Sequence, residues 1–364
     1  MNEGAAREGR GTAADLWRLQ LLARHTVVIS ATQKCPLSCA HCITSSSRDA
    51  PGAILSPELA EIWSADFPAM AADGLRHLTL TGGEPILALD AVGLLVRAAA
   101  AEGILPFVVT SGAWATTPAA ARNVVARAGP VARWDIGVDG WHAEQMPLAR
   151  IGHALTAIIE AGGGAIVRMC ESSDPATTRA WRDEIEVLVD GRAPILIQSV
   201  RQIGRARRQD PGHDAVDDGG LPRRPCVSTG LFVRADGSTG PCCSGLAYEA
   251  VGRHPLRYGS VRSAGALHDA WRAWRADPLL RLMRVASLAA LDGWMQDTPV
   301  ATARFSDDPC EACVAMWPLL SEAEADALRV RAASTAVATK LDALEALLQT
   351  TLLNDELSSH ASAS

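Results

Sequence analysis

The sequence lacks the features that would direct it to a nucleic acid or a membrane. It has no excess of basic charge, because 34 Lys and Arg stand against 41 Asp and Glu, for a formal net charge of −7. Nucleic acid is therefore not an expected partner, although Arg201, Arg205, Arg207 and Arg208 form a local basic cluster. The N-terminus has no apolar export segment, and charged residues interrupt the most apolar later stretches. We expect a cytoplasmic protein with no membrane partner.

An internal repeat is also missing, and the cysteine usage does not suit a disulfide framework. Nine cysteines in a chain without an export signal indicate metal ligation or redox chemistry in a reducing compartment. The 364 residues, 48% of them hydrophobic, can bury a full core. This length suits one large domain and a smaller one.

Short β-branched runs alternate with Ala- and Leu-rich stretches from about residue 26 to residue 200. This alternation is typical of β-α units around a parallel sheet. We therefore predict an α/β fold, a partial, TIM-like (β/α)6 barrel. The expected strands are Thr26–Ser30, Leu78–Thr81, Phe107–Thr110, Asp135–Val138, Ala165–Met169 and Ile195–Val200. Expected outer helices are Ser56–Ala72, with Ser56 as N-cap and Pro57 at the first helical position, and Asp90–Glu102.

Changes in composition divide the rest of the chain. A Gly-, Asp- and Pro-rich segment interrupts the alternation and indicates a linker. A Glu-, Ala- and Leu-rich stretch near the end predicts a helix to about Gln349, followed by a frayed tail over Ser358–Ser364. The predicted units are an N-terminal extension (1–25), the barrel (26–206), the linker (207–225), a smaller domain (226–320), and the C-terminal helix and disordered tail (321–364).

Three cysteines stand close together in the loop that leaves the first strand. Cys35, Cys39 and Cys42 have the spacing C-x3-C-x2-C, and three thiolates can ligate three irons of a [4Fe–4S] cluster while the fourth iron stays open. The alternative is structural zinc, with His41 or a distant cysteine as fourth ligand. Zinc sites, however, usually use paired C-x2-C units.

This loop resembles the cluster loop of the radical S-adenosylmethionine (SAM) superfamily, and the resemblance covers about residues 26 to 205. It implies that the open iron holds SAM, and that one electron cleaves SAM to methionine and a 5′-deoxyadenosyl radical that abstracts a substrate hydrogen. A second family element, Gly82-Gly83-Glu84-Pro85, follows the second strand. In the family this loop binds the SAM amino group. Glycines allow close backbone approach to a ligand, and a carboxylate can pair with an ammonium; a plain tight turn is the alternative.

Weaker family elements end the next strands. Ser111 follows the third strand and Asp139 the fourth, at positions where family members contact SAM or substrate. The family often has Ser where this chain has Gly137, and Ser111 or Arg168 is expected to compensate. Arg168 can pair with a carboxylate of SAM or substrate, or form a structural ion pair. We assign no catalytic acid or base.

A second cysteine set lies in the smaller domain. Cys226 and Cys242 match the opening C-x9–15-G-x4-C of SPASM and twitch domains, which are appended to many radical SAM enzymes. Between them a strand at 231–234 and an Asp-Gly turn predict a hairpin that brings the two cysteines together. Cys310 and Cys313 add two thiolates, enough for one fully ligated auxiliary [4Fe–4S] cluster. A zinc ion with four thiolate ligands is the alternative.

The remaining cysteines favour a one-cluster, twitch-like domain. Residues 314–364 contain none of the three further cysteines that a full SPASM pattern needs. Cys243 either replaces Cys242 as ligand, acts as a thiol near the substrate, or is only a neighbour. Cys170 is expected to be a buried strand cysteine.

Two enzymatic functions and one without catalysis remain open. The first is maturation of a ribosomally made peptide, because the stretch HCITSSSRDAPGAILSPE and the turn at 203–206 resemble SPASM peptide maturases. The second is oxidation or epimerisation of a small sugar or aminocyclitol, as in the twitch-type dehydrogenase of butirosin-like pathways. The third is a metal-stapled binding protein. Expected partners are a flavodoxin- or ferredoxin-type electron donor and, since only about 25 residues precede the first strand, a separate peptide-recognition protein.

Overall fold

The fold is seen in a computed structural model that describes residues 13–208, 220–248 and 254–361. Eight strands in these residues form one sheet, in the order β6-β5-β4-β3-β2-β1-β7-β8. Strands β1 to β7 pair in parallel, and β8 is antiparallel to β7. The strands are β1 Thr26–Ser30, β2 His77–Thr81, β3 Leu105–Thr110, β4 Arg133–Gly137, β5 Gly164–Cys170, β6 Ile195–Gln198, β7 Leu231–Arg234 and β8 Thr239–Gly240.

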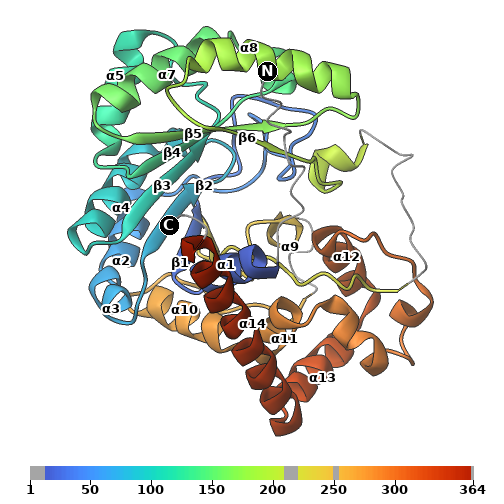
Figure 1. The fold of residues 1–364 in the computed structure, drawn as a ribbon. Coiled ribbons are helices and arrows are strands. Elements are labelled where there is room, and N and C mark those ends of the chain that lie inside the picture. The colour runs from blue at the N-terminus through green and yellow to red at the C-terminus, as the bar shows by residue number, and fades with distance from the viewer. Residues whose placement is uncertain (1–12, 209–219, 249–253, 362–364) are drawn as a thin grey trace.

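Helices follow the strands along the outside of the curved sheet, as Figure 1 shows. Those of the first half are α1 Ala13–Ala23, α2 Pro57–Ser64, α3 Phe67–Ala72, α4 Leu89–Ala101, α5 Pro118–Ala128, α6 Gly140–Ala143, α7 Ala149–Glu160 and α8 Pro175–Val189. Those of the second half are α9 Gly245–Tyr248, α10 Ala266–Ala276, α11 Pro278–Val285, α12 Pro309–Met316, α13 Glu322–Ala332 and α14 Thr335–Ala361. Short 3-10 turns include η1 Pro85–Ala88 and η2 Gly204–Arg208.

The predicted fold class is confirmed. All six strands expected in the first 206 residues are present, and β1 to β6 follow one another in chain order across the sheet. The sheet stays open, because β6 and β8 are its edges. Strand β7, which the sequence assigns to the smaller domain, pairs with β1 and so extends the same sheet.

The helix expected over Ser56–Ala72 is two helices. Its predicted start is correct, since Ser56 accepts a hydrogen bond from the backbone N–H of Leu59. The chain breaks after Ser64 and restarts as α3, which has Pro68 in its first turn. Proline cannot sit inside a helix, because it lacks an N–H and clashes with the preceding turn. At this break Asp66 accepts backbone N–H bonds from the first turn of α10. The break therefore docks the second half of the chain on the first.

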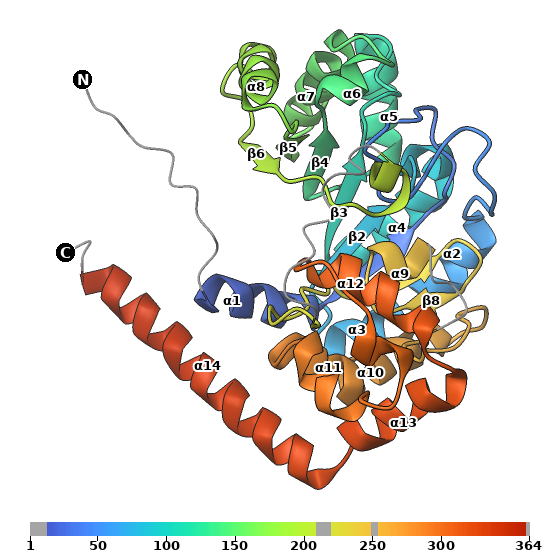
Figure 2. The same cartoon turned by 90° about the vertical axis from the view of Figure 1, so that its right-hand side faces the viewer.

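The C-terminal prediction is also corrected. The single helix expected after residue 321 is the pair α13 and α14 (Figure 2). The expected frayed tail is wrong for residues 358–361, which belong to α14, and residues 362–364 lie outside the described part. No Gly or Pro stands between 335 and 361 to stop the helix.

The predicted N-terminal extension contains a packed helix. Helix α1 buries Trp17 and contacts α14, and Gln20 accepts a hydrogen bond from Arg284 of α11 at 2.6 Å. The predicted linker falls largely outside the described residues, which omit 209–219, but Leu221 near its end is buried.

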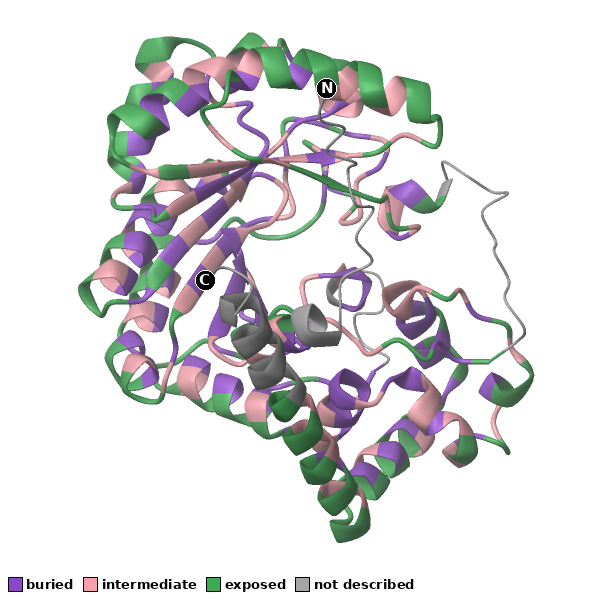
Figure 3. Ribbon diagram, in the orientation of Figure 1, coloured by how far each residue is buried: buried purple, intermediate pink, exposed green. Residues whose placement is uncertain are grey.

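The two faces of the sheet differ at β1 and β7. Val27 and Ile29 belong to the main core under the helices, whereas Val28 packs with Phe232 in a separate cluster on the other face. Successive strand residues point to opposite faces, so this second face is the inner one of the partial barrel. Buried residues follow the strands and the sheet-facing sides of the helices (Figure 3). Among the described residues, no helix has the length and apolarity to cross a bilayer.

Candidate active site

The first cysteine loop leaves the carboxyl end of β1 and is well ordered by its own backbone. Cys35 and Cys39 are buried, and Cys42 is half-buried. The backbone N–H of Cys35 donates to the carbonyl of Ser47 at 2.9 Å, which closes the loop. Burial raises the pKa of the Cys35 thiol to about 12. Such a thiol is protonated at neutral pH and ionises when a metal ion displaces its proton. The loop therefore suits metal ligation better than the chemistry of a free thiolate.

The turn after β2 is pressed against this loop. The N–H of Gly83 donates to the carbonyl of Thr32 at 2.7 Å, and the N–H of Glu84 donates to that of Lys34 at 2.9 Å. A Cβ added at Gly82 would lie 2.2 Å from the Thr32 oxygen, and one at Gly83 would lie 2.3 Å from the Lys34 oxygen. The close approach that these glycines allow is therefore to the cysteine loop.

Glu84 bonds within the protein at each carboxylate oxygen. One oxygen accepts from Thr110 Oγ1 at 2.8 Å and Ile86 N at 3.2 Å. The other accepts from Ser111 N at 3.0 Å and Ser111 Oγ at 2.6 Å. Burial raises the pKa of Glu84, and the Ser111 and Thr110 hydroxyls oppose this rise. Glu84 thus ties the turn after β2 to the end of β3, and Ser111 faces Glu84.

A third segment holds the loop from the end of β6. Arg205 donates from Nε to the Cys39 carbonyl at 2.9 Å and from Nη2 to the Ser46 carbonyl at 2.6 Å. Its own N–H donates to the Cys42 carbonyl at 3.0 Å. Gly204 has φ +65°, and a Cβ there would lie 2.4 Å from the Ile43 oxygen. Segments after β2 and after β6 thus fix the loop.

Asp139 is buried beside the loop and caps α6. Its Oδ1 lies 2.8 Å from His142 Nδ1, and its Oδ2 lies 3.4 Å from His41 Nε2. Burial opposes the charge of Asp139, but the hydrogen bond from His142 leaves its pKa lowered. Asp139, His41 and the half-buried Cys170 place one potential ligand atom each within 4.8 Å of one another.

Arg168 adopts the structural ion pair that the sequence left as an alternative. Its Nε lies 2.6 Å from Asp135 Oδ1, and Asp135 is buried. Both residues expected to compensate for Gly137, Ser111 and Arg168, therefore have protein partners. A Cβ at Gly137 would meet His142 at 3.5 Å, which is ordinary contact.

The second cysteine set is assembled from three segments. The hairpin of β7 and β8 carries Cys226 and Cys242 at its two ends, and α12 carries Cys310 and Cys313. Ser228 donates to the Pro241 carbonyl at 2.6 Å and ties the ends of the hairpin together. Burial raises the pKa of the Cys242 thiol to about 12, and the nearby Cys310 adds to this rise. Burial, then Cys226 and Cys242, raise the pKa of Cys313.

Side-chain donors point at these sulfurs. Arg201 Nη1 donates to Cys310 Sγ at 3.3 Å, and Trp317 Nε1 donates to Cys313 Sγ at 3.2 Å. Cys243 has different neighbours, because its Sγ lies 3.0 Å from Thr229 Oγ1 and it packs with the inner-face cluster of Val28 and Phe232. Cys243 therefore lies on the barrel side of the second set.

The sulfur spacing tests the zinc alternative. A tetrahedral zinc ion with Zn–S bonds of about 2.3 Å needs sulfurs about 3.8 Å apart. Among the described residues, which include all nine cysteines, no three cysteine sulfurs lie within 4.8 Å of one another. A [4Fe–4S] cluster spreads its thiolates over several irons and spaces them more widely. Zinc with three or four thiolate ligands would need the sulfurs of either set to move closer together.

Three residues near the site were not found from the sequence. His142 contacts Asp139, Arg205 contacts the cysteine loop, and the Tyr248 hydroxyl lies 3.5 Å from Ser30 Oγ. For His142 a signal exists, because it stands three residues after an Asp that can cap a helix. The Gly-Arg-Ala turn at 204–206 is visible in the sequence, but its contact with the cysteine loop is not, and nothing in the sequence places Tyr248.

The comparison with protein families decides what the first loop is. Residues 29–162 match the model described as the Radical SAM superfamily. The chain contains a radical SAM domain. The family implies a [4Fe–4S] cluster and SAM. A search of the curated proteins finds no match.

Solved structures similar to this chain include three with bound AdoMet. BtrN in complex with AdoMet and 2-DOIA is 11% identical, with 71% of this chain and 87% of that chain covered and a TM-score of 0.40. Native anSMEcpe with bound AdoMet is 12% identical, with 88% and 99% of the two chains covered and a TM-score of 0.46. Streptococcus suis SuiB bound to S-adenosylmethionine is 13% identical, with 71% and 65% of the two chains covered and a TM-score of 0.39.

Proposed function

We propose that this radical SAM enzyme reductively cleaves SAM and abstracts a hydrogen atom from a peptide, in the maturation of a ribosomally synthesised natural product. The observation that carries the chemistry is the loop of Cys35, Cys39 and Cys42, which the turns after β2 and β6 hold from two directions. When bound, the cluster and SAM supply a one-electron cleavage that yields methionine and a 5′-deoxyadenosyl radical.

The residues of the loop and the strand ends have separate parts in this proposal. Cys35, Cys39 and Cys42 would hold the cluster. The backbone of 82–85 would face the SAM amino group, while the Glu84 side chain keeps that backbone tied to Thr110 and Ser111. Asp139 would contact SAM or substrate from the end of β4. Arg168 would act through Asp135, which positions it at the end of β5.

The second cysteine set would hold one auxiliary [4Fe–4S] cluster, with Cys226, Cys242, Cys310 and Cys313 as its ligands. This cluster would lie in a twitch-like domain over 226–320, which the linker joins to the barrel of 26–206. Arg201 and Trp317 donate to two of these sulfurs, which offsets negative charge on the ligands. Such a site can accept the second electron when a substrate radical is oxidised. A flavodoxin- or ferredoxin-type protein would supply the first electron.

Two stretches that resemble peptide maturases contact each other, and this supports the peptide substrate. The stretch from His41 to Glu58 contains Ser46, and the turn at 203–206 contains Arg205, which donates to the Ser46 carbonyl. A separate recognition protein would deliver the peptide. The alternative substrate is a small sugar or aminocyclitol. A cavity of about 480 Å³ against the β7–β8 hairpin has a volume that suits a small ligand, although its arginines would repel the ammonium groups of an aminocyclitol.

The first experiment is a metal and product count on the full chain, purified and reconstituted without oxygen. Iron and sulfide are measured per chain for the wild type and for the triple variant Cys35→Ala, Cys39→Ala, Cys42→Ala. Each sample then receives SAM and dithionite. We expect about eight irons in the wild type and about four in the variant, with 5′-deoxyadenosine from the wild type alone.

Bound zinc without 5′-deoxyadenosine would refute the enzymatic proposal and favour a metal-stapled binding protein. About four irons in the wild type and none in the variant, with 5′-deoxyadenosine formed, would retain the SAM chemistry and remove the auxiliary cluster. Adding a candidate precursor peptide or an aminocyclitol then separates the substrates, because the true one changes mass if it is oxidised and changes its retention on a chiral column if it is epimerised.

A further inference from the structure

The inner face of the β7–β8 hairpin carries a cavity. Phe232 lies on this face, and Arg234, two residues later on the same strand, shares it. Gly240 on β8 pairs with Phe232, so it also belongs to this face. A Cβ added at Gly240 would meet no atom within 4 Å, although Gly240 is buried. The missing side chain therefore leaves open space beside Phe232.

This cavity has a volume of about 480 Å³ and a cationic lining. Phe232 and Leu246 are apolar residues of its lining, and Arg234, Arg257 and Arg262 are the basic ones. Asp236 is the one carboxylate among the described residues that line it.

Hydrogen bonds from neighbouring residues hold Asp236 and Arg262 in the lining. Ser238 donates to Asp236 Oδ1 from both its N–H and its hydroxyl, at 2.9 and 2.6 Å. Arg262 Nε donates to the carbonyl of Asp236 at 2.9 Å. His254 also lines the cavity, and burial lowers its pKa to about 4, so its imidazole is neutral at pH 7. Among the described residues of the lining, three arginines stand against one carboxylate.

The cavity adjoins the cysteine loop of the radical SAM domain. Arg234 pairs in register with Ser30, the last residue of β1. Its Nη2 also donates to Gln33 Oε1 at 3.3 Å, and Gln33 stands two residues before Cys35. A group bound in the cavity would thus lie beside the loop where SAM is expected.

We propose that this cavity binds an anionic group of the substrate, a carboxylate or a phosphate, through Arg234, Arg257 and Arg262. The proposal deepens the proposed function and rests on it. Guanidinium groups form paired hydrogen bonds with both kinds of anion, and the apolar wall excludes water from one side. The anion would anchor the substrate while a more distant C–H bond faces the cysteine loop.

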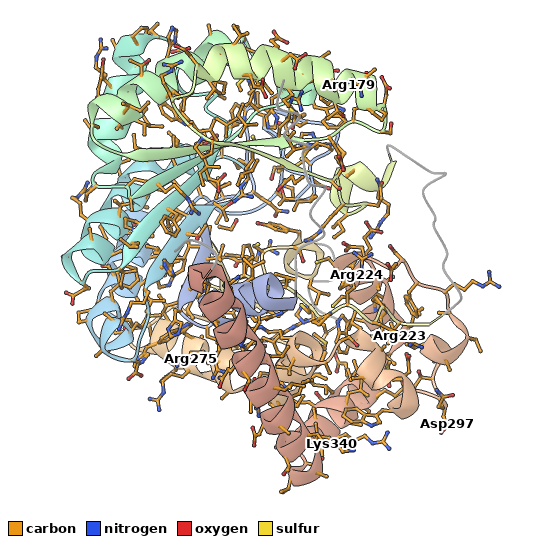
Figure 4. The ribbon with its side chains drawn as sticks, viewed as in Figure 1. Arg179, Arg223, Arg224, Arg275, Asp297 and Lys340 are labelled. Atoms are coloured by element: carbon orange, nitrogen blue, oxygen red, sulfur yellow. The ribbon has the colours of Figure 1, made fainter. Side chains whose placement is uncertain are left out.

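The test is calorimetric titration of the reconstituted full chain with two probes, inorganic phosphate and glutarate. Arg257→Gln removes one guanidinium, and Gly240→Leu fills the open space. The matched control is Arg224→Gln, because Arg224 (Figure 4) is exposed, pairs with Asp307 at 2.6 Å and does not line the cavity. We expect Arg257→Gln to weaken binding about tenfold, Gly240→Leu to abolish it, and Arg224→Gln to leave it unchanged.

Tighter binding of phosphate would identify a phosphorylated substrate, and tighter binding of glutarate an acidic side chain or terminal carboxylate. If neither probe binds the wild type, or if Arg257→Gln and Arg224→Gln bind alike, the proposal is wrong. Arg257→Gln decides this even if Gly240→Leu does not fold. Because binding needs no SAM cleavage, the absence of 5′-deoxyadenosine would contradict the proposed function without affecting this result.

Discussion

The two cysteine sets of this chain are built in opposite ways. The first set lies in one loop, between Cys35 and Cys42, and its supports are mostly backbone groups of neighbouring turns. The second set comes from two ends of a hairpin and from α12, and side chains of Arg201 and Trp317 reach its sulfurs. A compact loop is specified by local sequence. A site made of distant segments depends on the whole fold around it.

This difference predicts which changes each set tolerates. The first loop has no room for added atoms, because a Cβ added at Gly82, Gly83 or Gly204 would lie within 2.4 Å of a carbonyl oxygen. The second set is sensitive to side chains that bring its segments together.

The largest effect is expected from removing one ligand of each set. Cys39→Ala should abolish 5′-deoxyadenosine formation, because two thiolates do not hold the SAM-binding cluster. Cys313→Ala should lose about four irons yet still cleave SAM, since its set is separate from the first loop. Iron content and product are measured on the same samples. SAM cleavage that survives Cys39→Ala but not Cys313→Ala would reverse the assignment of the two sets.

A smaller but still severe effect is expected from Gly82→Ala. Gly82 has φ +142°, and the new Cβ would lie 2.2 Å from the Thr32 oxygen. Strain and overlap together should lower the free energy of unfolding by about 3 kcal/mol. Gly103→Ala is the matched control, with φ +69° and nothing within 4 Å, and should cost about 1 kcal/mol. Urea midpoints compare the two; equal costs would contradict tight packing at the loop.

Much of the first site could be predicted from the sequence, because its signals are local. The spacing of Cys35, Cys39 and Cys42 and the strand before them lie within 17 residues, from 26 to 42. Which groups the turn at 82–85 contacts could not be predicted. The sequence predicts a ligand near Glu84, and the structure adds Thr110 and Ser111 as its hydrogen-bond partners within the protein, brought close by the parallel pairing of β2 and β3.

The second site shows where sequence reasoning ends. The Asp-Gly turn predicted the hairpin, and Leu231–Arg234 is indeed a strand. The pairing of β7 with β1 has no local signal, since it depends on contacts between residues two hundred positions apart, such as Val28 and Phe232. The break at Asp66 was missed for the same reason. Asp66 caps the first turn of α10, and no pattern of residues near Asp66 in the sequence reveals this contact.

A medium effect on the free energy of unfolding is expected on acidification, from a histidine in the second half of the chain. His254 is buried, and this burial lowers its pKa from 6.5 to about 4. Above pH 6.5 this histidine is neutral in both the folded and the unfolded chain, so it does not change the free energy of unfolding. Between pH 6.5 and 4 only the unfolded chain binds the proton, which stabilises the unfolded state. At pH 5 the free energy of unfolding should therefore have dropped by about 2 kcal/mol from this group.

His254→Gln removes that titration. Urea unfolding of wild type and variant at pH 7.5 and pH 5.0 gives the difference between the two pH values for each protein. We expect the wild type to lose about 2 kcal/mol more than the variant. Equal losses of unfolding free energy in the two proteins would show that His254 binds protons in the folded protein and that its surroundings are open to water.

The smallest effect should separate the two sets most sharply. Arg205 donates to the carbonyls of both Cys39 and Ser46, and a lysine ammonium reaches only one of them. Arg205→Lys should cost about 1 kcal/mol, seen as about fivefold faster release of iron from the first site to a chelator. Iron of the second site should leave at an unchanged rate. Arg127→Lys, at an exposed pair with Asp90, serves as control. Faster release from both sites would mean that Arg205 stabilises the whole fold, because a clamp on one loop acts on the ligands of that loop alone.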